Sequence, residues 1–224
     1  AASTLSCSSD PGGDCSPDLI YAPWFHARGW PVLLFDFRNH GKSDGNLTSM
    51  VFYERYDLLA AIDFMVARGY ERIGLLGFSM GAATAIGTTP LSPRVRAVVA
   101  DSPFAELKPT LTRGAMNKGA PLWLARILMV FIFFFAARRL HCRPQDAAPI
   151  HAVGQFAGRP LLIILGGADE YIEASEGQRL FAAAGEPKEF WLVPRAPHRE
   201  ADKLEPERYR EKVMGWFERW LGEA

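Results

Sequence analysis

The sequence has no excess of charge: 25 Lys and Arg residues balance 25 Asp and Glu residues in a chain of 224. A neutral chain gives no electrostatic signal for a polyanionic partner, so we expect no nucleic acid to bind. The three cysteines, Cys7, Cys15 and Cys142, are too few and too scattered to indicate a disulfide framework. Because no CxxC motif occurs and His141 has one adjacent cysteine, the sequence predicts no metal site.

A long apolar run is also lacking. The uncharged stretch 127–137 (ILMVFIFFFAA) has Arg126 before it and Arg138 and Arg139 after it. A helix that crosses a membrane needs about 20 apolar residues, so this run is too short. Since the N-terminus shows no signal-peptide pattern either, we predict a cytoplasmic protein in which the run packs over the domain. Contact with a membrane surface is the less favoured alternative.

The pattern of apolar residues predicts an α/β fold. Hydrophobic residues make up 49% and charged residues 22% of the chain, a globular composition. Strand-like runs are expected at 32–37, 72–76, 95–100, 160–165 and 189–193, and helices at 19–28, 52–68, 175–184 and 205–221. This alternation is typical of a mostly parallel sheet with helices on both faces. The run 32–37 (VLLFDF) is apolar almost throughout and is expected to be buried on both faces.

Two segments fall outside this alternation. Residues 1–17 are rich in Ser, Gly, Asp and Pro and are expected to be irregular, so the domain proper is assigned to residues 18–224. Residues 104–156 hold the apolar run and several prolines but no clear strand. They are interpreted as a helical, cap-like insertion over the active site, although plain packing helices would give the same pattern.

The most informative motif is Gly77-Phe78-Ser79-Met80-Gly81, which fits the pattern G-x-S-x-G. A strand-like run precedes it and small residues suited to a helix follow it, and this context predicts a nucleophile elbow. Such a turn exposes the Ser79 hydroxyl above the sheet. It also directs the Met80 backbone N–H, at the start of the helix, toward an oxyanion.

A serine hydroxyl needs a base to take its proton and an acid to orient that base. In an elbow fold the chain order is serine, acid, histidine, and His198 follows the last predicted strand. Asp169, in the segment LGGAD after the strand at 160–165, is the preferred acid. Glu170 and Glu173 are close competitors, and Asp101, directly after the strand at 95–100, is the main alternative.

No cofactor is expected. The segment Gly41-Lys42-Ser43 looks like the end of a phosphate-binding loop, but that loop needs a glycine where Asp36 stands. No GxGxxG follows a predicted strand, which argues against a dinucleotide.

The segment 35–45 (FDFRNHGKSDG) resembles the D-x-R-x-H-G-x-S-x-G loop of α/β-hydrolases. Together with GFSMG, GGADE and APHRE, the resemblance runs from about Asp18 to the C-terminus. The chain is similar to the serine hydrolases that group monoacylglycerol lipases, acyl-peptide-type peptidases and small esterases. The resemblance implies that Ser79 is the nucleophile, Asp169 the acid and His198 the base, with Met80 as one oxyanion donor. Asp36, His40 and Gly45 would shape their loop.

The N-terminus departs from the family pattern. The family usually has two or three strands before the position of Asp18, and an H-G-x-G-G loop that supplies the second oxyanion donor. The corresponding stretch here is 9–13 (SDPGG), in which Pro11 falls at the donor position and has no N–H. The resemblance therefore implies missing N-terminal strands, an exposed sheet edge and an impaired oxyanion hole.

These observations predict a serine hydrolase that cleaves carboxylic esters through an acyl-enzyme. A small-molecule ester with an apolar acyl group is expected, because the run 127–135 supplies apolar surface to the insertion. One alternative is a peptidase or amidase with the same triad. Another is a catalytically impaired, hydrolase-like protein. The substrate-binding residues and the oligomeric state are left open.

Overall fold

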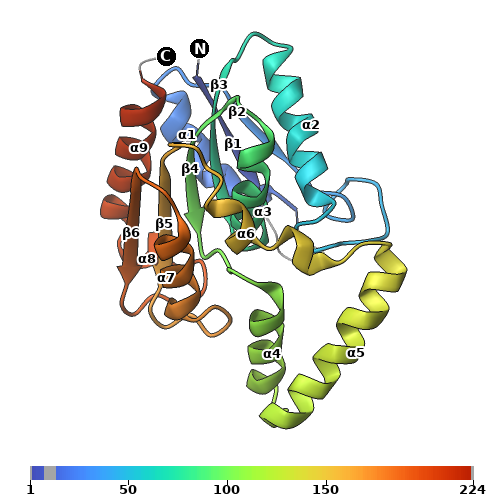
Figure 1. The fold of residues 1–224 in the computed structure, drawn as a ribbon. Helices are drawn as coiled ribbons and strands as arrows, with labels where there is room; N and C mark the ends of the chain where they lie inside the picture. The colour runs from blue at the N-terminus through green and yellow to red at the C-terminus, as the bar shows by residue number, and fades with distance from the viewer. Residues whose placement is uncertain (1, 8–13, 223–224) are drawn as a thin grey trace.

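The computed structural model describes residues 2–7 and 14–222. A six-stranded sheet in the order β2-β1-β3-β4-β5-β6 forms the centre, and every neighbouring pair runs parallel (Figure 1). The strands are β1 (Ala2–Cys7), β2 (Val32–Phe35), β3 (Arg72–Phe78), β4 (Val95–Asp101), β5 (Leu161–Gly166) and β6 (Lys188–Val193). The predicted α/β class with a parallel sheet is confirmed.

Helices cover both faces of the sheet. The α-helices are α1 (Ala22–His26), α2 (Glu54–Val66), α3 (Met80–Thr88), α4 (Leu107–Asn117), α5 (Leu122–Leu140), α6 (Pro149–Val153), α7 (Ala174–Ala183), α8 (Ala201–Leu204) and α9 (Pro206–Leu221). Short 3-10 helices lie at Ser16–Tyr21, Thr89–Leu91 and Pro144–Ala147. One buried cluster joins the sheet to α2, α3, α6 and α7, and a second joins it to α1, α8 and α9. The core is therefore two apolar layers on either side of the strands.

The expectation that residues 1–17 are irregular is wrong over Ala2–Cys7. This segment forms β1, which lies between β2 and β3 and pairs with both, Leu5 standing opposite Leu33 and Leu75. Its sequence, ASTLSC, holds one large apolar residue, so no hydrophobic pattern marks it as a strand. Backbone hydrogen bonds to two neighbouring strands stabilise it instead. Within the described residues, β1 and β2 extend the sheet beyond β3, and β2 is the last strand on that side.

The strand β2 also differs from expectation. All four of its residues are half-buried, whereas burial on both faces was predicted for this run. The residues of β2 are only half-buried because β2 is the edge strand of the sheet. Within the described residues it has a neighbouring strand on one side.

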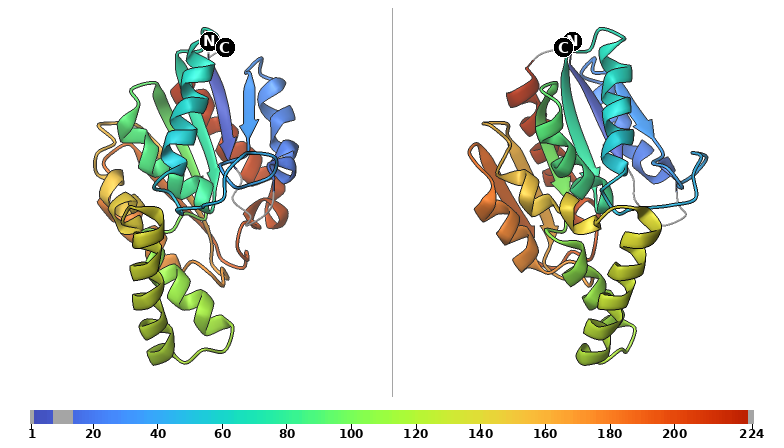
Figure 2. Two further views of the ribbon diagram at one scale, coloured as in Figure 1. Left: turned by 90° about the vertical axis from the view of Figure 1, so that its right-hand side faces the viewer. Right: turned by 45° about the vertical axis from the view of Figure 1, so that its right-hand side comes forward.

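The insertion expected at 104–156 divides into two parts. The helices α4 and α5 form a hairpin that projects from the carboxyl ends of the strands (Figures 1 and 2). The short helix α6 instead packs Val153 into the core beside α3. The part of the insertion that projects from the body is thus the α4–α5 hairpin. None of the helices in the described residues combines the length and apolarity that crossing a membrane requires.

Candidate active site

Ser79 stands at the turn between β3 and α3. Its backbone has φ 50° and ψ −114°, a combination that non-glycine residues adopt rarely and at a cost in strain. The turn is tight enough that a Cβ on Gly77 would lie 2.6 Å from the carbonyl oxygen of Gly81. The Ser79 N–H donates to the Asp101 carbonyl at 2.8 Å, which ties the turn to the end of β4. This is the strand–turn–helix arrangement that GFSMG predicts.

The structure brings together three of the predicted side chains. His198 Nδ1 lies 2.6 Å from Asp169 Oδ2, and His198 Nε2 lies 3.0 Å from Ser79 Oγ. An ionised carboxylate only accepts hydrogen bonds, so Nδ1 carries the proton and donates it to Asp169. In the neutral ring Nε2 is then an acceptor and faces the Ser79 hydroxyl.

The Asp169 carboxylate is held in one orientation. Its side chain is fully buried, and its Oδ1 accepts hydrogen bonds from the Tyr171 and Ile172 N–H groups, both at 2.8 Å. Both backbone donors engage one oxygen, which leaves Oδ2 directed at His198. The ring of Tyr171 also packs edge-on against the imidazole, with centroids 5.4 Å apart.

The loops after β5 and β6 approach each other closely, and this brings Asp169 to His198. Ala168 N–H donates to the Ala196 carbonyl at 3.0 Å, and Gly167 N–H donates to the Val193 carbonyl at 2.7 Å. A Cβ on Gly166 would overlap the Ala196 carbonyl oxygen, so the contact requires glycine at that position.

The residue after His198 anchors the same loop from the other side. Arg199 pairs with the buried carboxylate of Asp18 at 2.8 Å, and its guanidinium lies 4.8 Å from the ring centroid of Phe78. The Arg199 N–H also donates to Ser102 Oγ at 3.3 Å. These contacts fix the backbone that presents the imidazole. Pattern reasoning missed them because Asp18 and Arg199 are far apart in the sequence.

The competing acids occupy other positions. The Asp101 carboxylate accepts from Tyr209 OH at 2.7 Å and from Ser102 Oγ at 2.9 Å, and its hydrogen bonds do not involve His198. Glu173 pairs with Arg113 on α4, and Glu170 is exposed. Among the four acids considered, Asp169 is the one that contacts the histidine.

Burial raises the pKa of Asp101 to about 6, whereas the hydrogen bonds from Tyr209 and Ser102 and the charge of Arg199 act to lower it. Asp101 adjoins the elbow through its backbone, because its main-chain carbonyl accepts the hydrogen bond from the Ser79 N–H. Burial likewise raises the pKa of Tyr209 well above its ordinary value, so this phenol stays protonated and donates. The sequence gives no signal for this pair, because 108 residues separate its members.

Asp101 should make stability depend on pH. Its pKa is higher in the folded than in the unfolded chain, so the folded state binds more protons between about pH 3.8 and 6. We therefore expect the free energy of unfolding to fall as pH rises through this window, by at most about 1.4 kcal/mol per pH unit. Urea unfolding of the native chain and of Asp101→Asn across this range measures the effect. A constant difference between the two proteins would contradict it.

Met80 is the first residue of α3, directly after the strained serine, so its backbone N–H lies at the positive end of the helix dipole. This placement agrees with the position expected for an oxyanion donor. The other predicted feature, the segment 9–13 with Pro11, lies outside the described residues.

The segment 35–45 forms a tight loop in which Asp36 bonds backbone groups. Its carboxylate accepts from the Cys15 N–H at 2.8 Å and the Lys42 N–H at 3.2 Å, and its carbonyl accepts from Ser43 Oγ at 2.7 Å. His40 is buried, and its Nδ1 lies 2.9 Å from the Arg38 carbonyl. These bonds shape the loop, as the resemblance implies.

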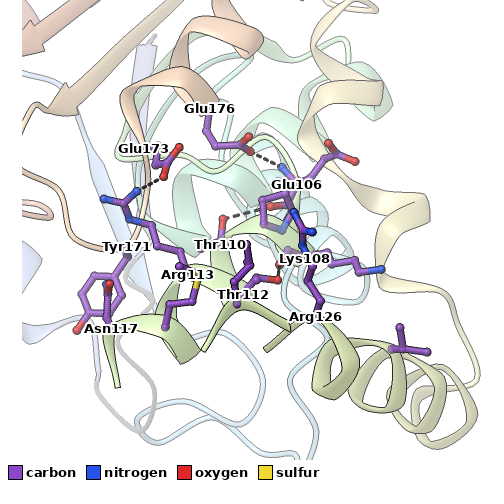
Figure 3. Close-up of a pocket in the computed structure, with 14 residues that line it drawn as sticks. Glu106, Lys108, Thr110, Thr112, Arg113, Asn117, Arg126, Tyr171, Glu173 and Glu176 are labelled. Carbon is purple, nitrogen blue, oxygen red and sulfur yellow. Dashed lines mark hydrogen bonds and ion pairs between the residues drawn. The ribbon is translucent and has the colours of Figure 1, made fainter. Parts of the chain in front are cut away.

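A cavity of about 680 Å³ lies between the α4–α5 hairpin and the segment after Asp169 (Figure 3). Its lining includes the apolar side chains of Pro109, Met116, Leu122 and Val130. It also includes six charged side chains: Glu106, Lys108, Arg113, Arg126, Glu173 and Glu176. The helix α4, which forms one side of the cavity, is bonded to the segment after β5. Its Arg113 pairs with Glu173 and donates to the Glu170 carbonyl at 3.0 Å. Tyr171, whose ring packs on His198, also lines the cavity, although Ser79 and His198 do not. A separate cavity of about 270 Å³ is lined by His198 itself, together with Tyr21 and Arg199.

The parallel sheet with helices on both faces and the strand–turn–helix elbow at Ser79 define an α/β-hydrolase fold. Residues 20–147, more than half of the chain, match the model of the family described as serine aminopeptidase, S33. The chain belongs to this family.

Relatives and solved structures agree with this assignment. The uncharacterized protein YqkD of Bacillus subtilis is 30% identical over 205 residues, a match that covers 89% of this chain and 66% of YqkD. The thiohydrolase aneE of Aspergillus aculeatus is 38% identical over 96 residues, covering 39% of this chain and 30% of the relative. The chain spans just under two thirds of the length of YqkD. The structure of the Pyrococcus furiosus esterase Pf2001 superposes with a TM-score of 0.78 at 26% identity, covering 98% of this chain and 84% of the esterase.

Proposed function

We propose that this chain hydrolyses carboxylic esters through an acyl-enzyme formed on Ser79. The observation that carries the proposal is the hydrogen-bonded series from Ser79 through His198 to Asp169. Each of the three follows a different strand of one parallel sheet, at the edge where ligands bind in such folds.

The geometry supports the following sequence of steps. His198 Nε2 takes the proton from Ser79 Oγ as that oxygen attacks the ester carbonyl carbon. Asp169 keeps the proton on Nδ1 and stabilises the imidazolium that forms. The imidazolium then donates its Nε2 proton to the alcohol as the alcohol leaves. A water molecule, deprotonated by the same nitrogen, attacks the acyl-enzyme and releases the carboxylic acid.

The tetrahedral oxyanion needs hydrogen-bond donors, and the Met80 N–H is proposed as one of them. The second would come from the segment 9–13, where proline stands at the expected donor position. Loss of one such donor typically costs about 10²–10³ in kcat. We therefore expect slow turnover of ordinary esters when no other group donates the second hydrogen bond to the oxyanion.

The cavity beside Tyr171 is proposed as the site for an apolar part of the substrate. Met116, Leu122 and Val130 contribute apolar side chains to its lining. Within the run 127–135, Val130 is the single residue that lines it among the described residues, so the run as a whole does not form an acyl site.

Two measurements test the proposal. We expect a fluorophosphonate probe to label Ser79, and p-nitrophenyl esters to be cleaved faster than aminoacyl p-nitroanilides. From acetate to octanoate, kcat/KM should rise a few-fold per carbon until the pocket is filled, because each buried methylene contributes about 0.8 kcal/mol. Faster cleavage of the anilides would favour the peptidase, which the name of the family also suggests. Absence of labelling would favour a non-catalytic protein.

A further inference from the structure

The helix α5 exposes an unusual amount of apolar surface. Of the 18 large hydrophobic residues exposed in the described part of the chain, ten lie on this one helix, with between 39% and 64% of each residue accessible. They are Leu122, Trp123, Leu124, Ile127, Leu128, Val130, Phe131, Ile132, Phe134 and Phe135. Single exposed apolar residues are normal, but a contiguous apolar patch indicates an interaction surface.

Most of the exposed residues lie on the broad side of α5 that faces away from Ala125 and Met129, whereas Leu122 and Val130 line the cavity. Leu124, Leu128, Phe131 and Phe135 recur at spacings of three and four, as residues on one side of a helix do. Ala125 and Met129 are buried, which places the opposite side against the rest of the fold. We call the exposed side of α5 the outer face. The projecting hairpin carries this face away from the sheet (Figure 2).

The hairpin also differs in charge from the rest of the chain. Residues 107–143 hold seven Lys or Arg and no Asp or Glu, although the chain as a whole has 25 of each sign. Three of the cations, Arg126, Arg138 and Arg139, are on α5 and exposed, and none pairs with an acidic side chain of the described residues. Arg126 lines the cavity, whereas Arg138 and Arg139 lie in the last turn of α5, so they place positive charge at one end of the apolar outer face.

We propose that the outer face of α5 docks on the surface of an anionic phospholipid bilayer. Attachment to a bilayer surface strengthens with the apolar area that is buried and with attraction to anionic lipid. The helix α5 supplies exposed apolar area together with arginines left unpaired by the acidic side chains that the structure describes. Each nearby Lys or Arg strengthens attachment to anionic lipid. The inference does not depend on the proposed ester hydrolysis, because it concerns binding alone.

A second copy of the chain fits the outer face less well. In a two-fold contact the same patch meets itself, so the arginines of one α5 would face a hairpin that has no acid to pair with them. Phosphatidylserine head groups offer the negative charge that such a contact lacks.

The docking also has a geometric consequence. The hairpin projects from the edge of the sheet where Ser79, Asp169 and His198 lie (Figure 1). Leu122 and Val130 of α5 line the cavity beside Tyr171. A docked outer face would thus bring this cavity close to the lipid surface.

Co-sedimentation with vesicles tests the apolar part of the proposal. The full 224-residue chain is mixed with phosphatidylcholine vesicles that contain or lack phosphatidylserine, and we expect binding to the anionic vesicles alone at low salt. Leu128→Glu should weaken that binding by about tenfold or more. Leu91→Glu is the matched control, because Leu91 is 49% exposed and Leu128 45%, and Leu91 lies outside the hairpin. This control should bind like the native chain.

The charge contribution has its own variants. Arg138→Gln with Arg139→Gln should weaken binding to anionic vesicles by about fivefold per arginine. Arg68→Gln is the control, because Arg68 and Arg138 both lie over a phenylalanine ring. Arg68 is 3.4 Å from the ring centroid of Phe64, and Arg138 is 4.8 Å from the ring centroid of Phe134. Three results would each overturn the proposal: no binding to anionic vesicles, equal loss in Leu128→Glu and Leu91→Glu, or a vesicle-free dimer that Leu128→Glu dissociates.

Discussion

Ser79→Ala should lower kcat for p-nitrophenyl butyrate by about 10⁶, to the rate that binding and the remaining groups support. The substitution removes the oxygen that lies 3.0 Å from His198 Nε2, so no acyl-enzyme can form. Alanine carries a Cβ as serine does, so the strained backbone at φ 50° is not made worse and the elbow should persist. Steady-state kinetics with burst analysis and loss of fluorophosphonate labelling measure the effect.

A second serine serves as the control for this result. Ser102 is buried, follows the neighbouring strand and also has a positive φ of 56°, but its hydroxyl bonds Asp101 rather than His198. Ser102→Ala should keep fluorophosphonate labelling and lose no more than about tenfold in kcat. Near-native turnover by Ser79→Ala, with an unchanged circular dichroism spectrum, would contradict the assignment of the nucleophile.

The local motif predicts the strand–turn–helix geometry at Ser79 because such a turn restricts the residues of the chain around it. A serine on this tight turn needs glycine at position 77, a strand before it and a helix after it, and all of these are contiguous in the sequence. The order of serine, acid and histidine then restricts the choice to residues after strand ends. The structure places Asp169 and His198 within hydrogen-bond distance, as the proposed roles require.

Structural features that depend on contacts between residues far apart in the sequence are harder to predict from the sequence. The strand β1 consists mostly of small and polar residues and forms because two neighbouring strands pair with it, so no local pattern predicts it. The same limit applies to Tyr209, whose bond to Asp101 links α9 to β4. For the helix α5 the sequence pattern is clear but the expectation fails. Apolar residues all around a helix predict that the helix is buried. Its outer face is instead exposed, since the hairpin projects from the body.

Asp169→Asn should lower kcat by about 10⁴ with little change in KM, because the variant favours the wrong histidine tautomer. The Tyr171 and Ile172 N–H groups would hold the amide oxygen of the asparagine where they now hold Oδ1. The amide NH₂ would then point at His198 Nδ1, which must accept that bond and so lose its proton. The proton moves to Nε2, where it prevents this nitrogen from taking the proton of Ser79.

Asp101→Asn is the matched control, because it makes the same substitution at a buried carboxylate that also follows a strand of the sheet. Its oxygens bond Tyr209 and Ser102 and leave the tautomer of His198 unaffected, so kcat should change by no more than a few-fold. Parallel measurements of kcat for the two variants, with unfolding free energies to exclude loss of folded protein, separate the two carboxylates. A large effect at Asp101 with a small one at Asp169 would assign the acid to β4 instead, since the orienting group must be the one whose charge holds the proton on Nδ1.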